Sequence, residues 1–198
     1  MNNDYYQQHA ERFFTETVTV DMSALYQPFV AHLKPGVRIL DAGCGSGRDA
    51  RAFHEMGYDV EAFDASAELV ALARQHSGLP VEQKRFEEVT EVERYDGIWC
   101  CASLLHVPLA ELPEVMSRLA RALKPDGVWY LSFKYGSGER EKDGRVFTDM
   151  DEPGLKALVR GLAGIEVVEM WQTGDQRPGR AEEGWLNVTM NKNHNARC

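Results

Sequence analysis

The sequence predicts an α/β fold in which helices cover both faces of a doubly wound, mostly parallel sheet of seven strands. Short apolar runs alternate with amphipathic segments of helical period along most of the 198 residues, which is the pattern of repeated strand–helix units. One apolar run, residues 37–41, leads into a turn with Gly43, Gly45 and Gly47 at alternate positions. Ligands of such sheets bind beyond the carboxyl ends of the strands, so this turn marks the expected site.

The predicted elements follow one another in a regular order. Strands are expected at residues 37–41, 58–64, 81–86, 95–102, 128–133, 165–171 and 185–190. Helices are expected at residues 48–56, 66–76, 112–123 and 155–162, where apolar side chains recur every three or four positions. Gly57 ends the first of these helices, and Lys124-Pro125-Asp126-Gly127 breaks the third. Residues 134–151 are expected to form a polar excursion.

The glycine turn indicates a nucleotide-like ligand. Glycine permits positive φ and lets the backbone approach a ligand that a Cβ atom would repel, and the next helix offers unpaired N–H groups. The dinucleotide pattern G-x-G-x-x-G would need its third glycine at position 48, where the chain has Arg48. The spacing therefore argues against a pyrophosphate. A turn that only reverses the chain is the alternative interpretation.

A second acid follows about 20 residues further on, where doubly wound folds place a carboxylate on the ribose hydroxyls. The second predicted strand ends there, at Asp64. A carboxylate accepts hydrogen bonds from two neighbouring hydroxyls, whereas it would repel a 2′-phosphate. Asp64 is also placed to cap the helix that begins near Ser66, and the two roles are compatible.

Several motifs occur together in a characteristic order. They are the D-x-G-x-G-x-G turn from Asp41 to Gly47, Asp64, Tyr95-Asp96-Gly97-Ile98-Trp99, Leu104-Leu105-His106-Val107 and Leu123-Lys124-Pro125-Asp126-Gly127. In this order they resemble the class I S-adenosylmethionine-dependent methyltransferases of small molecules, and the resemblance covers most of the chain. It implies a Rossmann-like sheet with an antiparallel last strand, S-adenosylmethionine as cofactor and S-adenosylhomocysteine as product. Residues 45–49 with Ser103 to His106 are similar to the small tellurite-resistance-type methyltransferases.

The resemblance also implies which residues hold the cofactor. The first motif is expected beside the methionine part and Asp64 on the ribose. Many relatives place an aspartate by the adenine after the third strand, where this chain has Phe86-Glu87-Glu88, so either glutamate is a candidate. The expected cofactor-binding residues are Asp41, Ala42, Gly43, Cys44, Gly45, Gly47, Asp64, Ala65, Phe86, Glu87 and Cys101.

Methyl transfer is an in-line displacement, so the protein must chiefly align the acceptor and exclude water, and a strong base is optional. His106 and Tyr6 are the candidate catalytic residues. A structural role for His106, in which its ring forms a hydrogen bond to the backbone at a helix start, is equally compatible with the sequence. The resemblance implies that residues 1–34 form an N-terminal helical lid, whose aromatic rings would shield the sulfonium of the cofactor. Packing of an amphipathic helix on the sheet is the alternative. The rings of this segment are Tyr5, Tyr6, His9 and Phe13.

Charged residues near the expected site suggest contacts with anionic groups. Arg12 is a candidate partner of the methionine carboxylate, with surface exposure as the alternative. Arg177 and Arg180 lie in a loop where an acceptor would bind and would select an anionic acceptor. Solvated loops of this composition are also common.

Composition excludes several classes of protein. The formal net charge of −9 argues against a nucleic-acid partner, because such proteins usually show a basic face. With no candidate membrane span or leader, we expect a cytoplasmic protein. The four cysteines lack metal-ligand spacing, so reduced thiols and no metal are expected.

The length predicts one domain, residues 1–198, with its core at 35–190, a flexible tail at 191–198 and a monomeric or homodimeric state. Its partner is expected to be a small-molecule methyl acceptor. Two rival functions remain from the sequence. A non-catalytic module would bind S-adenosylmethionine without turnover, and a nicotinamide-dependent oxidoreductase would bind NAD instead.

Overall fold

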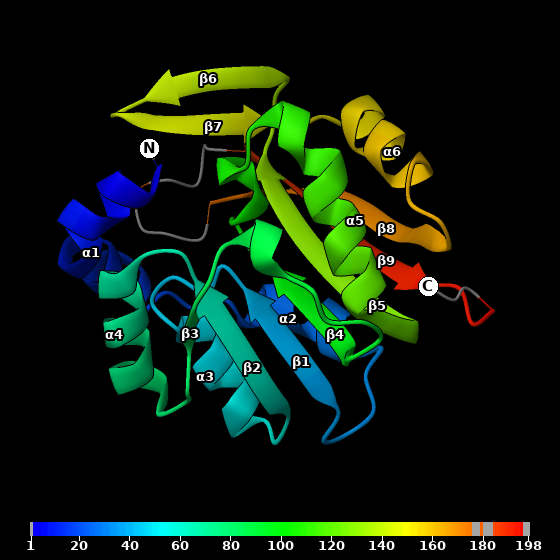
Figure 1. Cartoon of the computed structure of the whole chain (residues 1–198), viewed down its shortest axis with the longest axis horizontal. Coiled ribbons are helices and arrows are strands. Elements are labelled where there is room, and N and C mark those ends of the chain that lie inside the picture. Colours follow the sequence, from blue (N-terminus) through cyan, green and yellow to red (C-terminus); the bar gives the residue numbers. More distant parts are fainter. Residues whose placement is uncertain (1, 176–178, 180–183, 196–198) are drawn as a thin grey trace.

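A computed structural model describes residues 2–175, 179 and 184–195 of the chain (Figure 1). The helices are α1 (Asn2–Thr17), α2 (Ser23–Val30), α3 (Arg48–Glu55), α4 (Ala67–Ser77), α5 (Leu112–Ala122) and α6 (Glu152–Arg160). The strands are β1 (Arg38–Ala42), β2 (Asp59–Asp64), β3 (Glu82–Gln83), β4 (Tyr95–Cys100), β5 (Leu123–Lys134), β6 (Gly138–Lys142), β7 (Arg145–Asp149), β8 (Ile165–Gly174) and β9 (Gly184–Lys192). No helix in these ranges is long and apolar enough to cross a membrane.

Within the described residues, the main sheet has seven strands in the order β3-β2-β1-β4-β5-β9-β8. Strands β1 to β5 pair in parallel, and β9 runs antiparallel to both of its neighbours, β5 and β8. The predicted doubly wound sheet with an antiparallel last strand is thus confirmed. The chain reverses its direction of travel across the sheet between β1 and β4, and such a switch point is where a ligand-binding crevice opens.

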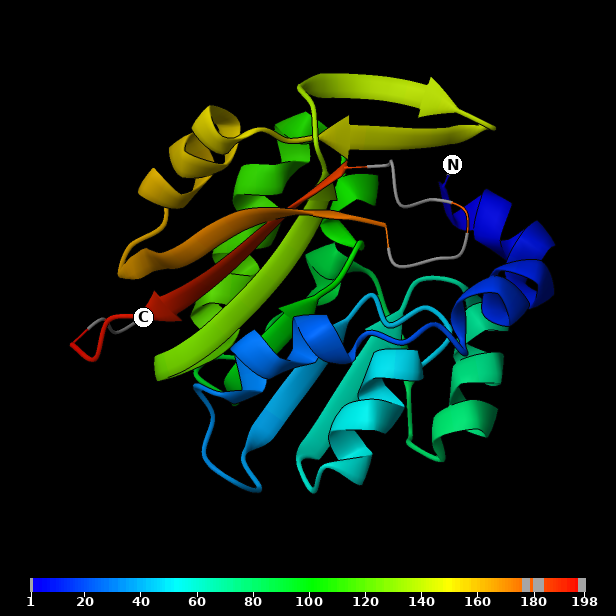
Figure 2. The same ribbon diagram turned by 180° about the vertical axis from the view of Figure 1, so that it is seen from behind.

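Helices cover both faces of the sheet, as Figures 1 and 2 show. On one face α2, α3 and α4 pack over an aromatic cluster in which the Trp99 and Tyr130 rings stack with centroids 4.1 Å apart. On the other face α5 and α6 bury mainly aliphatic side chains. Both faces of the sheet are therefore shielded from solvent, which explains why the central strands are continuous apolar runs in the sequence.

The expected N-terminal lid, residues 1–34, contains two helices with different surroundings. Helix α1 packs against α4 at the end of the sheet that carries the glycine turn. Helix α2 belongs to the core instead, since its Phe29 is fully buried and a Cβ atom at Gly97 would lie 2.8 Å from the Phe29 ring. Only α1 therefore has the position of a lid.

The expected polar excursion at residues 134–151 contains a β-hairpin formed by β6 and β7. Its two-residue loop is Asp143-Gly144, with φ of 54° and 74°. Positive φ at both central residues matches the right-handed twist of the flanking strands, and Asp-Gly is a favoured pair for such a loop. Asp-Gly between the two strands was the sequence signal for this hairpin, and the prediction of a polar excursion did not use it. The hairpin lies beyond the main sheet, above α1 in Figure 1.

Several predicted boundaries were wrong. The third predicted strand, residues 81–86, is reduced to β3, and Phe86 lies in a turn of 3₁₀ helix instead. Leu123, expected in a helix, begins β5, and the expected break at residues 124–127 is an irregularity inside that strand. Asn191 and Lys192, expected in a flexible tail, belong to β9. The Lys192 ammonium is buried and donates to the carbonyl oxygens of Ala120 and Leu123, so it satisfies carbonyls at the end of α5. Residues 196–198 of the tail lie outside the described residues.

Candidate functional site

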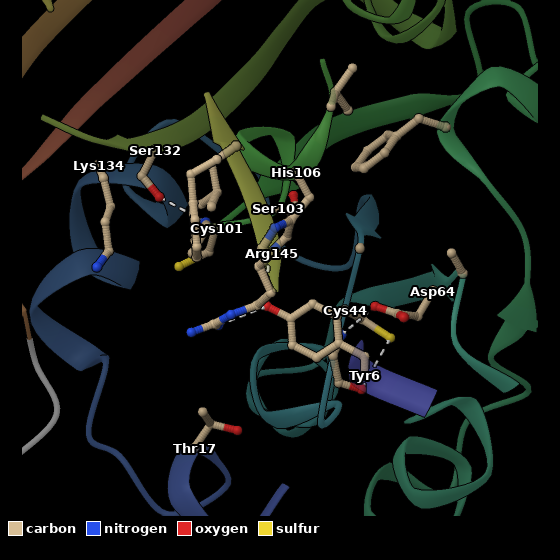
Figure 3. A pocket seen from close by; sticks show the side chains of 18 of the residues that line it. Tyr6, Thr17, Cys44, Asp64, Cys101, Ser103, His106, Ser132, Lys134 and Arg145 are labelled. Atoms are coloured by element: carbon tan, nitrogen blue, oxygen red, sulfur yellow. Dashed lines mark hydrogen bonds between the residues drawn. The ribbon is translucent and has the colours of Figure 1, made fainter. Parts of the chain in front are cut away.

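A cavity of about 780 Å³ lies at the carboxyl ends of the parallel strands (Figure 3). The glycine turn and the end of β2 form one side of it, and the β6–β7 hairpin and the ends of β5, β8 and β9 form the other. Tyr6 and Phe13 of α1 also line it. The volume is within the range of small-molecule sites and has room for a nucleoside-sized cofactor together with a small second ligand.

The glycine turn is held close to its neighbours. The N–H groups of Gly43 and Cys44 donate to the carbonyl oxygen of Phe63, at 3.0 and 2.9 Å, which ties the turn to β2. Gly43 has a φ of 76°, and a Cβ atom there would lie 2.6 Å from the Cβ atom of Ser103. At Gly45 a Cβ atom would lie 3.0 Å from the Phe13 ring. Glycine is therefore required here for both backbone conformation and space.

Asp64 ends β2 and lines the cavity. One carboxylate oxygen accepts from the N–H of Gly45 at 2.9 Å, and the other accepts from the N–H of Ser66 at 3.0 Å. Burial raises the pKa of Asp64, and the hydrogen bonds from the backbone oppose this shift. With a further hydrogen bond from the backbone of Ala65, the carboxylate still keeps some acceptor capacity for a ligand. A ligand with hydroxyl donors would stabilise the ionised carboxylate, as the ribose expectation requires.

Most of the other expected cofactor residues also line the cavity. They are Gly43, Cys44, Gly45, Ala65, Phe86, Glu87 and Cys101. Between the two glutamates after β3, it is Glu87 that lines the cavity, whereas the Glu88 carboxylate accepts from the N–H of Arg85 at 3.1 Å and closes a turn of 3₁₀ helix.

Asp41, Ala42 and Gly47 do not line the cavity but lie behind it. Ala42 is fully buried in β1, and Asp41 is 2% exposed. Burial raises the pKa of Asp41, and its Oδ2 atom has no hydrogen-bond partner among the described residues. A Cβ atom at Gly47 would lie 3.0 Å from the Cβ atom of Ala73, so this glycine serves the packing of α3 on α4.

Tyr6 and His106, the candidate catalytic pair, meet inside the cavity. Tyr6 Oη lies 2.8 Å from His106 Nε2, although the residues are 100 positions apart in the chain. Burial, together with the positive charge of nearby Arg145, lowers the pKa of His106 to about 3, and a hydrogen bond to the backbone of Val146 partly opposes this shift. That bond favours the protonated ring, so the ring donates it, and Nε2 is left to accept from Tyr6. Burial also raises the pKa of Tyr6, so both groups are neutral.

The depressed pKa of His106 predicts an acid-sensitive fold. Below about pH 6.5 the imidazole of His106 is protonated in the unfolded chain but stays neutral in the folded protein. The free energy of unfolding should therefore fall by roughly 1.4 kcal/mol per pH unit towards pH 3. His106→Gln should remove this contribution, and urea unfolding from pH 7 to 4.5 measures it. His54→Gln, at an exposed position, is the control. The raised pKa values of Asp41 and Asp64 change the free energy of unfolding with pH in the opposite direction. Both residues are present in the wild type and in the two variants, so their contribution cancels in the comparison. Equal pH profiles for the wild type and His106→Gln would contradict the expectation.

A buried ionic network underlies the glycine turn. Arg48 donates to both carboxylate oxygens of Asp49, at 2.8 and 3.2 Å. The same carboxylate accepts from the hydroxyl of Tyr26 and, at 2.9 Å, from the indole N–H of Trp99. Arg48 and Asp49 also line the cavity. The network joins α2, α3 and β4, and sequence reasoning missed it because its members are far apart in the chain.

The part of the cavity opposite the glycine turn is lined by side chains from β5, β7 and the β8–β9 pair. They include Lys134, Arg145, Phe147, Asp175, Trp185 and Asn187. Arg177 and Arg180, expected here, lie outside the described residues. Arg12 does not line this cavity, because its side chain is 73% exposed and pairs with Glu16.

The cysteines at the site are thiols. Burial raises the pKa of Cys101 to about 12 and that of Cys44 well above its usual value, so neither is a thiolate near neutral pH. No group of three potential metal-ligating side chains occurs in the part of the chain that the structure describes.

Known proteins resemble this chain in sequence and in fold. A family model described as a methyltransferase domain matches residues 39–127. A ubiquinone biosynthesis O-methyltransferase from Xanthomonas campestris pv. campestris (strain B100) is 35% identical over 106 residues, which are 50% of this chain and 43% of the relative. The match therefore spans less than half the length of that curated relative.

Two solved structures extend the comparison. The Burkholderia thailandensis 1,6-didemethyltoxoflavin-N1-methyltransferase, with bound 1,6-didemethyltoxoflavin and S-adenosylhomocysteine, superposes with a TM-score of 0.77 at 26% identity, over 97% of this chain and 86% of that one. Magnesium protoporphyrin IX methyltransferase from Synechocystis PCC 6803, with bound S-adenosylhomocysteine, has a TM-score of 0.74 at 16% identity, over 96% and 97% of the two chains. The second likeness shows the fold alone.

Proposed function

This chain belongs to the class I S-adenosylmethionine-dependent methyltransferase superfamily, and from this we propose that it transfers a methyl group from S-adenosylmethionine to a small-molecule acceptor. The observation that carries the proposal is Asp64, which meets the glycine turn at the edge of a cavity large enough for both ligands. The domain organisation, cytoplasmic location and monomeric or homodimeric state expected from the sequence remain predictions.

The residues of the cavity fit this cofactor. Side chains at Gly43 and Gly45 would collide with Ser103 and Phe13, which suits a backbone that contacts the methionine part. The acceptor capacity left on Asp64 suits ribose hydroxyls. The Ser103 hydroxyl lines the cavity, is buried and has no hydrogen-bond partner among the described residues, so a polar ligand atom can satisfy it. Phe86 and Glu87 are left for the adenine.

The bound cofactor would supply a methyl group made electrophilic by a positively charged sulfur. The chain's own contribution is then to hold the acceptor in line with that methyl group and to keep water out. Tyr6 and His106 are placed for this task, because they enter the cavity from opposite sides and bond to each other. With a pKa of about 3, His106 is a weak base, so the pair orients the acceptor more than it removes a proton.

Calorimetric titration with S-adenosylmethionine, S-adenosylhomocysteine and NAD tests the proposal. We expect the first two to bind and NAD not to bind. Mass spectrometry should then detect methylation of a member of a panel of thiols, oxyanions, amines and phenols. Binding of NAD alone would favour the oxidoreductase, and cofactor binding without turnover on any acceptor would favour the non-catalytic module.

Tyr6→Phe should slow methyl transfer without weakening cofactor binding. The change deletes only the hydroxyl that bonds to His106, so we expect kcat to fall about tenfold, within the range for loss of an orienting hydrogen bond. The dissociation constant for S-adenosylhomocysteine should change by less than about threefold. Steady-state kinetics and calorimetry measure the two quantities. Tyr5→Phe is the matched control, because the structure gives its hydroxyl no hydrogen bond to a described residue. Equal kcat values in both variants would remove Tyr6 from the mechanism.

A further inference from the structure

Arg145, the first residue of β7, carries a cation that no described carboxylate neutralises. Its Nε atom is buried and has no hydrogen-bond partner among the described residues. One terminal nitrogen lies 3.5 Å from Tyr6 Oη, which is a long and weak contact. The residue is partly buried, and the part of a guanidinium that is removed from water is costly unless an anion or another acceptor replaces the lost hydration. The position therefore calls for a negative group that the described part of the chain does not supply.

Neighbouring rings hold this guanidinium in place. Its Cζ atom lies 4.5 Å from the centroid of the Tyr5 ring and 4.9 Å from that of Phe147. Arg140 contacts the same Phe147 ring at 4.7 Å but has its own carboxylate, Asp149, at 2.6 Å. Of the two arginines on this ring, Arg145 is the one left to pair with a ligand. A guanidinium that lies against rings can still offer its terminal N–H groups to an oxyanion.

The location separates Arg145 from the proposed cofactor site. The Tyr6 phenol interacts with both Asp64 and Arg145, so it stands between the acid at the ribose position and the arginine. Arg145 lines the same cavity on the side formed by the hairpin, and Lys134 adds a second positive charge there, with Nζ 5.7 Å from the Phe147 centroid. In Figure 3 the Arg145 side chain passes beside the Tyr6 hydroxyl, and its guanidinium lies on the side away from Asp64.

We propose that the methyl acceptor is a small organic anion whose carboxylate or other oxyanion pairs with Arg145, which holds the reacting atom beside Tyr6 and His106. This inference rests on the proposed function, since it names the class of molecule that occupies the second half of the same cavity. It differs from the expectation for Arg177 and Arg180, because the cation comes from the hairpin instead of the loop before β9. The chain then discriminates acceptors mainly by charge.

Calorimetry with matched acid and amide pairs tests the assignment. The protein is first saturated with S-adenosylhomocysteine, then titrated with salicylate, 4-hydroxybenzoate and 3,4-dihydroxybenzoate and with the amide of each. We expect at least one acid to bind about tenfold or more tightly than its amide, the scale of a charge-assisted pair. Arg145→Met should bring that ratio to within about threefold and leave the affinity for S-adenosylhomocysteine unchanged. Arg140→Met, on the same ring, should keep the preference for the acid.

The outcomes separate this inference from the proposed function. Failure of the wild type to bind S-adenosylhomocysteine contradicts the function itself. Normal cofactor binding without a preference for the acid in any pair, including the case in which no member of the panel binds, overturns the anionic acceptor. A preference that survives in Arg145→Met does the same. If Arg145→Met instead weakens binding of S-adenosylhomocysteine, the arginine serves the carboxylate of the cofactor, and the assignment to the acceptor is wrong.

Discussion

Asp64→Ala is expected to raise the dissociation constant for S-adenosylmethionine by about 30-fold or more, equivalent to about 2 kcal/mol. Two losses contribute to this effect. The ribose hydroxyls lose an ionised acceptor, and the N–H of Gly45 loses the carboxylate that now holds it at 2.9 Å, so the glycine turn is less well positioned. Calorimetric titration of the folded variant measures the change directly.

The control for this experiment is Asp59→Ala, at the start of the same strand. Asp59 is 57% exposed and pairs with Arg38 far from the cavity, so cofactor affinity should not change. Circular dichroism of both variants would show that the fold survives. Unchanged affinity in folded Asp64→Ala would exclude Asp64 from the binding site.

Asp49→Ala is expected to lower the free energy of unfolding by about 3–5 kcal/mol, the scale for breaking a buried ion pair. The substitution leaves the guanidinium of Arg48, the hydroxyl of Tyr26 and the indole N–H of Trp99 without their common acceptor. Urea unfolding measures the loss. Glu55→Ala, on the same helix, removes a pair in which Arg51 is 46% and Glu55 is 61% exposed, and should cost about 1 kcal/mol or less.

A milder variant keeps the expectation testable if Asp49→Ala does not fold. Tyr26→Phe deletes one donor to the carboxylate and should cost about 1.5–3 kcal/mol, as expected for a hydrogen bond to a charged group. If both variants cost no more than Glu55→Ala, the network does not stabilise the domain. Because Arg48 and Asp49 line the cavity beside the turn, the same loss should also weaken cofactor binding.

The side of the cavity formed by the glycine turn and Asp64 could be predicted from the sequence because its signals are local. Strand β1, the glycine turn and α3 are contiguous, and Asp64 stands at the end of an apolar run. Each conformation there depends on neighbours in the chain, such as the positive φ of Gly43, and spacing alone reports it. The same spacing suggested Asp41 and Gly47 as ligands, yet the structure places both behind the cavity, since spacing does not show which way a side chain faces.

On the opposite side of the cavity, the sequence suggested Tyr6 and His106 as separate candidates but missed their contact and missed Arg145, because this side is assembled from distant segments. Tyr6 and His106 are 100 positions apart, and Arg145 reaches the pair only because the Asp143-Gly144 turn folds β7 back over α1. The charged and apolar residues of the hairpin suggest a solvated loop unless Asp143-Gly144 is recognised as a hairpin turn. The buried partners of Asp49 are likewise brought together by three separate elements.

The sequence by itself therefore determined the fold class through strand–helix periodicity, and it indicated a ligand site at the glycine turn through glycines that tolerate backbone conformations other residues avoid. Only the tertiary structure decided which acids and cations share one cavity, which glutamate lines it, and which arginine has no carboxylate partner among the described residues. The physical reason is that hydrogen bonding, burial and charge depend on distances through space, and packing of the hairpin and α1 on the sheet sets those distances independently of separation along the chain.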